Sequence, residues 1–280
     1  MSTPVILDVD TGADDAVAIF MAGRHPAVEL RAILTTHGNA PHATTLENTL
    51  RTVSVGELTN VPVYPGADFP LVSKMVSTFE IQHRLLALPE TSLTPETKRA
   101  ADFLVEYYMS EKGPETIYVP LGPQTNLALA LSIEPQLAKR IPAIVTMAGS
   151  IYSGNTTPSA EFNIIADPEA AHIVFNSGIP ITMVGLEVTK KAFVTREDVN
   201  AMKALGTPWG EASAKLTLKD VNWFDKHTDM PGAEVYDACA IAAIVDKDLL
   251  TTKPMRVDIE LSGQHTRGKT VADLRYYGNT

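Results

Sequence analysis

The sequence contains one cysteine, Cys239, among its 280 residues. An internal disulfide is therefore excluded, and this cysteine usage is typical of the reducing cytoplasm. Cys239 stands inside an apolar run, so we expect a packed thiol rather than a nucleophile. No apolar run approaches the roughly 18 residues that a membrane-spanning helix needs. The chain also enters a strand-like segment at once, so we expect no signal peptide, a cytoplasmic location and no membrane partner.

Basic residues are outnumbered: 23 Lys and Arg stand against 33 Asp and Glu, and the formal net charge is −10. A nucleic-acid partner would require a basic face, so this balance argues against one. Internal repeats, low-complexity segments and long Pro/Gly linkers are also absent from the sequence. With 45% hydrophobic and 20% charged residues, we expect a single globular domain that spans residues 1–280.

The densest group of acidic residues lies near the start of the chain. An apolar strand-like run is followed by Asp8 and Asp10, and Gly12 then permits a tight turn before Asp14 and Asp15 open a helical segment. Caps and exposed strand ends explain one or two such acids, but hardly four at one corner. Clustered carboxylates repel one another unless a cation binds, and oxygen ligands suit Ca²⁺ or Mg²⁺.

Apolar, strand-like segments alternate with helical ones along most of the chain. We expect strands near 5–7, 29–36, 61–64, 116–121, 144–149, 179–184 and 256–260. Between them, residues 43–56 and 95–112 have helical patterns, the second with Thr94 as N-cap and Gly113 just after its end. This alternation predicts an α/β fold, with an open, mostly parallel, Rossmann-like sheet and helices on both faces.

Polar residues follow several of the expected strands, where open α/β sheets bind their ligands. Asn39 comes after the second strand, although a turn residue after Gly38 is an equally good interpretation. The turn 122–126 exposes backbone carbonyls that suit a metal ion. Residues 65–93 lack a clear period and mix Pro, Ser and Thr, so we expect a mobile lid there.

The stretch from Asp8 to Asp15 resembles the Asp-x-Asp-x-Gly-x-Asp-Asp signature of the nucleoside hydrolases. Four further blocks in the same order are similar to that family: residues 122–128, 147–150, 155 with 160–171, and 236–240. Phosphatases of the haloacid dehalogenase type also begin with a strand and Asp-x-Asp. They usually have Thr or Val where Gly12 stands, and they lack the Asp14-Asp15 pair, so the nucleoside hydrolases are the better match.

The resemblance implies a hydrolase that cleaves the N-glycosidic bond of ribonucleosides to give ribose and a free base. It also implies a Ca²⁺ ion held by Asp10, Asp15, Asp237 and the backbone carbonyl of Thr125, with Asp10 as general base. Asp8 then has either a supporting or a purely structural role. The residues that match those gripping the ribose are Asp14, Asn39, Asn155, Glu161 and Asn163, while Met147 matches one that lies against the sugar.

The sequence differs from the family pattern at the residues that would act on the departing base. Many nonspecific members have His immediately before the metal-binding Asp, and that His helps to protonate the base; here the position is Tyr236. A His-Gly-x-x-Gly-type segment is also missing, and residues 78–84 take its place. Three alternatives remain open: Tyr236 as donor, His227 or His83 brought in by a loop, or stacking on Trp223 or Phe224. Stacking of the base on an aromatic side chain would favour a purine nucleoside as substrate.

The sequence thus predicts a Ca²⁺-dependent ribonucleoside hydrolase of nucleoside salvage, and the resemblance implies a homodimer or homotetramer. Within the family, the alternative is a hydrolase of a modified or unusual ribosyl compound. Alternatives of a different class are the phosphatase already named and a non-catalytic relative that binds ribose or metal.

Overall fold

The computed structural model describes residues 2–72 and 85–275, and its centre is a sheet of parallel strands in the order β3-β2-β1-β4-β5-β6. These strands are β1 (Thr3–Val9), β2 (Val28–Thr35), β3 (Val63–Pro65), β4 (Ile117–Pro120), β5 (Ile144–Met147) and β6 (Ile181–Val184). All of them pair in parallel, so their carboxyl ends share one edge of the sheet. The predicted α/β class is confirmed.

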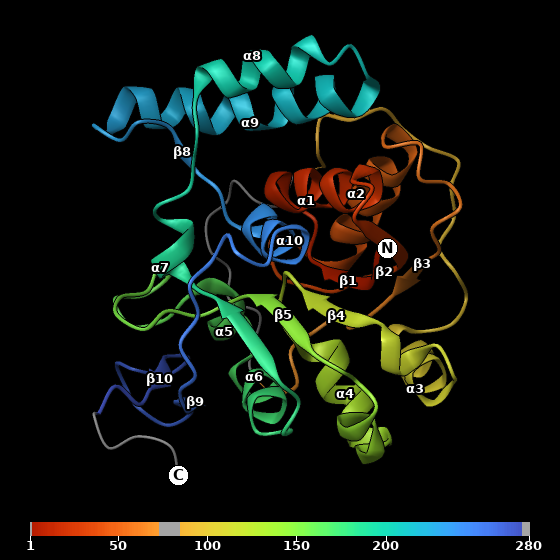
Figure 1. Ribbon diagram of the computed structural model, residues 1–280, viewed down its shortest axis with the longest axis vertical. Coiled ribbons are helices and arrows are strands. Elements are labelled where there is room, and N and C mark those ends of the chain that lie inside the picture. Colours follow the sequence, from red (N-terminus) through yellow and green to blue (C-terminus); the bar gives the residue numbers. More distant parts are fainter. Residues whose placement is uncertain (1, 73–84, 276–280) are drawn as a thin grey trace.

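Helices cover both faces of this sheet (Figure 1). On one face lie α1 (Ala13–Arg24), α2 (His42–Val55) and α10 (Asp237–Val245), while the other carries α3 (Ala100–Met109), α4 (Thr125–Ile133), α5 (Phe162–Ala166) and α6 (Pro168–Phe175). Alternate residues of β1 face opposite layers: Val5 and Leu7 enter the core beside α1 and α10, and Ile6 enters the core beside α3 and α4.

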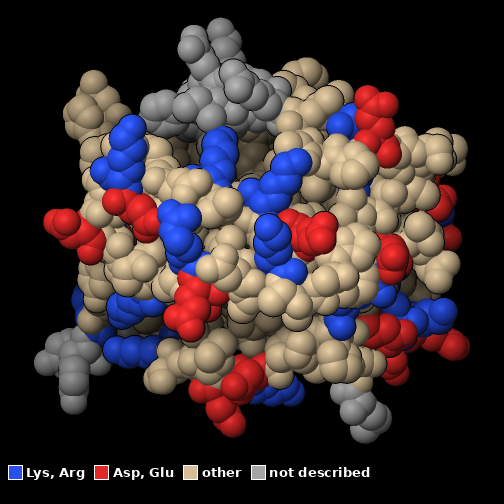
Figure 2. Space-filling view, turned by 90° about the horizontal axis from the view of Figure 1, so that it is seen from above, with Lys and Arg blue, Asp and Glu red and all other residues tan. Residues whose placement is uncertain are grey.

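A helical pair, α8 (Arg196–Ala204) and α9 (Pro208–His227), lies above α1 and α2 (Figure 1). The face of the molecule on that side carries lysines and arginines with aspartates and glutamates among them (Figure 2). The smaller elements are α7 (Leu186–Thr189), the 3₁₀ turns η1 (Gly113–Glu115) and η2 (Pro135–Lys139), and the antiparallel pairs β7 (Phe193–Val194) with β8 (Ala233–Glu234) and β9 (Val257–Ile259) with β10 (Thr270–Ala272). None of the described helices is both long and apolar enough to cross a membrane.

The helix expected at residues 95–112 is shorter than predicted. It begins only at Ala100, and Arg99 rather than Thr94 precedes its first turn. The Glu96 backbone amide donates to the carbonyl of Val63 in β3, at 2.8 Å, so the preceding segment is bonded to the edge of the sheet. The hydrogen bond to β3 therefore overrides the local helix start signal at Thr94.

Cys239 is a packed thiol in α10, as predicted. Only 9% of the residue is exposed, and its Sγ donates to the carbonyl of Val235 at 3.1 Å. Burial raises the pKa of this thiol to about 11, so it stays protonated and unreactive at neutral pH.

Asp8 faces the α3–α4 layer and belongs to the framework behind the carboxyl edge. It accepts hydrogen bonds from the Tyr118 hydroxyl and from Asn126 Nδ2, the latter at 2.8 Å. Burial raises the pKa of Asp8 to about 7, and these two donors oppose the rise. Of the two roles left open by the sequence, the structural one accounts for both carboxylate oxygens.

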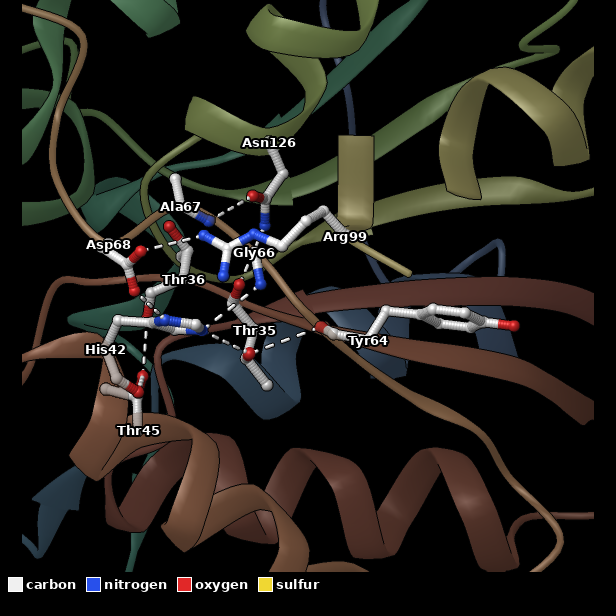
Figure 3. A network of polar contacts seen from close by, with 10 residues as sticks. All are labelled: Thr35, Thr36, His42, Thr45, Tyr64, Gly66, Ala67, Asp68, Arg99 and Asn126. Carbon is white, nitrogen blue, oxygen red and sulfur yellow. Dashed lines mark hydrogen bonds and ion pairs between the residues drawn. The ribbon is translucent and has the colours of Figure 1, made fainter. Parts of the chain in front are cut away.

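Asn126 extends this framework into the network drawn in Figure 3. Its Nδ2 donates to the carbonyl of Thr35 and its Oδ1 accepts from the amide of Ala67 at 2.8 Å. In the same network His42 bridges Thr35 and Asp68, with 2.8 Å and 2.6 Å contacts. The end of β2 is thus tied to α2, α4 and the segment after β3, which keeps the carboxyl edge of the sheet in place.

Candidate active site

A cavity of about 210 Å³ opens at the carboxyl edge of the sheet, beside the adjacent strands β1 and β4. The chain leaves these two strands toward opposite sides of the sheet, and such switch points are where open α/β folds bind ligands. The lining residues come from six separate segments: Asp10, Asp14, Asn39, Leu121, Met147, Asn155, Glu161, Phe162, Asn163, Tyr236 and Asp237. Nine of these were predicted as site residues from the sequence.

Asp10 sits in a close backbone cradle just after β1. Its Oδ2 accepts the amide of Asn39 at 2.6 Å, and Gly38 and Gly122 approach its carboxylate from two sides. A Cβ at either glycine would overlap that carboxylate, so both positions require glycine. The turns that contain Gly38 and Gly122 therefore hold the Asp10 carboxylate in a fixed place.

The two carboxylate oxygens of Asp15 differ in their hydrogen bonding. Its Oδ2 accepts from the amide of Gly12 at 2.8 Å and from Asn39 Nδ2 at 3.2 Å. Its Oδ1 is buried and has no hydrogen-bond partner among the described residues. Leaving a buried carboxylate oxygen without a partner is costly, and a bound cation removes that cost.

Carboxylate oxygens of Asp14, Asp15 and Asp237 all lie within 4.8 Å of one another. Burial raises the pKa of Asp15 to about 8 and that of Asp237 well above its ordinary value, and the neighbouring carboxylates add to both shifts. Burial and the charge of Asp15 likewise raise the pKa of Asp10. The cluster is therefore unfavourable as a group of bare anions, and a divalent cation would stabilise its ionised form.

These residues suit a hard cation, because every charged donor in the cluster is an oxygen. The closest trio contains Asp14, whereas the resemblance named Asp10 together with Asp15 and Asp237 as ligands. Asp10 lines the same cavity as Asp14 and Asp237. The predicted set and the closest trio thus belong to one acidic cluster.

The predicted backbone ligand, Thr125, is the first residue of α4 and is not among the residues that line the cavity. It is fully buried, and its hydroxyl contacts Asp167 at 2.7 Å and His37 Nε2 at 3.1 Å. Its side chain is therefore committed to the protein, which leaves the main chain as the part it could offer to a metal.

The far wall of the cavity is built around Glu161, the N-cap of α5. Its carboxylate accepts the amides of Gly149 and Asn163, both at 2.8 Å. Asn163 Nδ2 donates to the carbonyl of Leu121 at 2.7 Å and to that of Met147 at 3.0 Å. The side-chain nitrogen of Asn163 is thus already hydrogen-bonded to the protein, and its side-chain oxygen is the group left for a ligand.

Asn155 is arranged in the opposite sense. Its Oδ1 accepts the amide of Phe162 at 3.0 Å, so its amide nitrogen is the group left to donate. The cavity lining therefore combines a carboxylate cluster with an amide donor and an amide acceptor. Such a set can hold a polyhydroxylated ring by hydrogen bonds on several sides.

Sequence comparison identifies the family that carries this site. The model of the inosine-uridine preferring nucleoside hydrolases matches residues 5–279. The chain is also 38% identical to the pyrimidine-specific ribonucleoside hydrolase RihA of Escherichia coli O1:K1 / APEC, over 99% of this chain and 90% of that protein. The chain belongs to the nucleoside hydrolase family. The family predicted from the sequence is confirmed, and the chain is an N-glycosyl hydrolase rather than a phosphatase.

Solved nucleoside hydrolases share the fold across almost the whole chain. The purine-preferring ribonucleoside hydrolase from Gardnerella vaginalis is 32% identical, with a TM-score of 0.89, over 97% of this chain and 88% of that one. An inosine-guanosine nucleoside hydrolase is 30% identical, with a TM-score of 0.86, over 99% and 88%. These relatives differ in the bases that their names state, so the likeness does not select a base for this chain.

Of the candidates for activating the departing base that lie within the described residues, only Tyr236 lines the cavity. Its hydroxyl donates to the carboxylate of Glu234. Burial, followed by the charge and hydrogen bond of Glu234, raises the pKa of Tyr236 further above its ordinary value. A phenol held in this way stays neutral and gives up its proton reluctantly.

Trp223, Phe224 and His227 are not among the residues that line the cavity. Trp223 is 54% exposed near the end of α9 and stacks on His227, with 4.9 Å between ring centroids. His227 Nδ1 is 2.8 Å from the carbonyl oxygen of Trp223, and Phe224 packs edge-on against Trp223. His83 and residues 78–84 lie outside the described residues. The roles predicted for Trp223 and His227 therefore stay predictions.

Two lining residues, Leu121 and Phe162, were not predicted. Leu121 directly follows β4, and a residue at the end of a parallel strand is a general signal for a ligand site. Phe162 stands between the predicted Glu161 and Asn163, so its place beside them could also have been inferred. Both add apolar surface to a largely polar cavity.

Tyr236→Phe is expected to lower kcat for inosine by less than about tenfold, because the hydroxyl is bound to Glu234 and resists ionisation. A general acid contributes about 10²–10⁴-fold to a rate. For the same reason the raised pKa of Tyr236 predicts no loss of activity from phenol ionisation between pH 7 and pH 10. Steady-state rates of the two proteins over that range test this, with Glu234→Gln as the matched variant that leaves the phenol in place. A loss of a hundredfold or more would instead make Tyr236 the acid.

Proposed function

We propose that the chain is a Ca²⁺-dependent ribonucleoside hydrolase that releases a free base and ribose. The observation that carries this proposal is the cavity itself, whose lining joins the acidic cluster to the amide groups of Asn155 and Asn163, while one buried oxygen of Asp15 has no partner among the described residues. Family membership supplies the reaction class, and the residues that line the cavity support the binding of both a cation and a ribose.

The metal would be held by Asp10, Asp15, Asp237 and the backbone carbonyl of Thr125. When bound, Ca²⁺ would orient a water molecule and make it easier to deprotonate. Asp10 is then the general base that accepts the proton of that water, and its cradle of Gly38, Gly122 and the Asn39 amide keeps the carboxylate in one orientation.

The ribose would be held between the two sides of the cavity, with its hydroxyls bonded to Asp14, Asn39, Asn155, Glu161 and Asn163. Met147, 2% exposed at the end of β5, would lie against the sugar. Holding the ring in place lowers the entropic part of the barrier. As the glycosidic bond breaks, positive charge develops on the ribose, and the surrounding carboxylates stabilise it.

The wider setting belongs to the same proposal: a cytoplasmic enzyme of nucleoside salvage that forms a homodimer or homotetramer. The single cysteine supports a reducing compartment. The related proteins include one named for pyrimidine and one named for purine nucleosides, so they do not select the base that this chain prefers. Stacking of the base on an aromatic side chain would favour purines.

The test is release of base and ribose from a panel of purine and pyrimidine ribonucleosides, each with Ca²⁺ and with a chelator. We expect cleavage that the chelator abolishes and added Ca²⁺ restores. Cleavage of purine ribosides alone supports leaving-group stacking, whereas cleavage of uridine or cytidine as well requires a proton donor. Full activity in the chelator would contradict the metal assignment. Binding of nucleosides without turnover would instead indicate a modified ribosyl substrate or a non-catalytic relative.

A further inference from the structure

Behind the acidic cluster, three buried side chains form a continuous chain of hydrogen bonds: His37, Thr125 and Asp167. Thr125 Oγ1 lies 2.7 Å from Asp167 Oδ2 and 3.1 Å from His37 Nε2. All three residues are at most 1% exposed, and none of them lines the cavity. They join the end of β2, the start of α4 and the start of α6, which are far apart in the sequence.

The direction of each hydrogen bond follows from the donors available. The carboxylate of Asp167 acts as an acceptor, because its Oδ2 also takes the amide of Leu71 at 2.9 Å and its Oδ1 takes that of Ala170 at 3.1 Å. The single hydroxyl proton of Thr125 therefore goes to Asp167. Thr125 Oγ1 can then only accept from His37, so His37 carries its proton on Nε2.

Two members of this chain lead to the proposed metal site. Thr125, in the middle, has the backbone carbonyl that is the proposed neutral ligand. His37, at one end, is followed by Gly38, which closely approaches the Asp10 carboxylate, and by Asn39, whose amide donates to Asp10 at 2.6 Å. Asn39 Nδ2 also reaches Asp15 at 3.2 Å. One hydrogen-bonded chain thus fixes the residues next to several proposed ligands.

We propose that Asp167 is a positioning residue for the metal site, acting through the Thr125 hydroxyl. This inference rests on the proposed Ca²⁺-dependent function. Asp167 also caps α6, but a cap needs only one carboxylate oxygen, and here Oδ1 provides it. The second oxygen is free to serve Thr125 and Leu71, so the two roles are separable by atom.

Two substitutions separate positioning from folding. Asp167→Asn preserves an N-cap, since Asn and Asp cap helices about equally well. While the Asn oxygen caps α6, however, its NH₂ group takes the place of Oδ2 and accepts from neither Thr125 nor Leu71. Thr125→Val removes the hydroxyl and keeps the backbone carbonyl. Controls are Asp68→Asn, an acid in the neighbouring network of Figure 3 that does not contact Thr125, and Thr52→Val, which removes a buried hydroxyl in α2.

The readout is the dissociation constant for Ca²⁺, measured by calorimetry and by competition with Tb³⁺ luminescence on the full chain. We expect Asp167→Asn and Thr125→Val each to weaken Ca²⁺ binding at least tenfold. Because both break the same contact, the double variant should be little weaker than either single one. The two control variants should stay within about twofold of the unsubstituted protein, and kcat of Asp167→Asn should recover at saturating Ca²⁺.

Unchanged Ca²⁺ affinity in both Asp167→Asn and Thr125→Val would overturn the positioning role while leaving the proposed function intact. Additive losses in the double variant would also overturn it, because the two residues would then act independently. If the unsubstituted protein bound no Ca²⁺, the proposed metal-dependent function would fail first, and the inference with it. The binding measurement therefore distinguishes the two failures.

Discussion

Asp10→Ala is expected to lower kcat by about a thousandfold or more, even at saturating ribonucleoside. The substitution removes both the proposed general base and a proposed metal ligand, and a general base alone contributes about 10²–10⁴-fold. Saturation with substrate cannot restore the rate, because the lost group acts on the water rather than on nucleoside binding. Release of ribose from inosine or uridine, with excess Ca²⁺, measures the effect.

Asp8→Asn is the matched control, since it changes a carboxylate two residues away, within β1. Its partners are Tyr118 and Asn126 rather than cavity groups, so the side-chain amide would face a donor and cost about 1–3 kcal/mol of stability. We expect a lower melting temperature with kcat within a few-fold of the unsubstituted protein. Retained turnover in Asp10→Ala would refute Asp10 as base and ligand.

The site could be predicted from the sequence where its residues lie at ends of strands. Asp10 follows β1, Asn39 follows β2 and Met147 ends β5, and parallel strands bring these ends to one edge. The fold was equally accessible, because buried strands and amphipathic helices alternate with distinct periods. Strand order and the neighbours of α10 depend on long-range packing, so only the family resemblance connected Asp237 to the cluster.

Contacts made by side chains across the fold were not predictable in the same way. Asp8 and Asp10 look alike in sequence and share a strand face, yet Asp8 bonds to β4 and α4 while Asp10 lies at the cavity. Asp167 is the N-cap of α6, but its bond to Thr125 spans 42 positions. No local pattern specifies such a pair, since it arises only when α4 and α6 pack together.

The groups around a departing base are the least predictable part for a related reason. Trp223 and His227 lie four residues apart on α9, so their mutual stacking follows from helical spacing. Whether a helix end faces the cavity depends on how α8 and α9 sit above α1, which is a matter of tertiary packing. Tyr236 lines the cavity and directly precedes Asp237, while its predicted role stays a prediction.

A 2′-deoxyribonucleoside is expected to be hydrolysed with kcat/KM about 10⁴-fold below that of the matching ribonucleoside. A site built to hydrogen-bond a substrate hydroxyl rejects the analogue that lacks it, because its own polar groups are left unpaired. Asp14 and Asn39 are the proposed partners on the acidic side of the cavity, and Asp14 also belongs to the cluster of carboxylates within 4.8 Å. Inosine and 2′-deoxyinosine, compared at saturating Ca²⁺, measure the ratio.

Asp14→Ala turns this comparison into a test of the contact itself. If Asp14 binds the 2′ hydroxyl, the variant should lose most of its activity on inosine and much less on 2′-deoxyinosine, so the ratio should shrink by at least tenfold. Tyr236 lines the same cavity but has no proposed contact to the 2′ hydroxyl. The Tyr236→Phe variant should therefore keep the full ratio of kcat/KM between inosine and 2′-deoxyinosine. Equal kcat/KM for the two nucleosides in the unsubstituted protein would mean that the acidic cluster does not recognise the ribose. Its four carboxylates would then serve the metal alone, and the amide groups of Asn155 and Asn163 would have to hold the sugar.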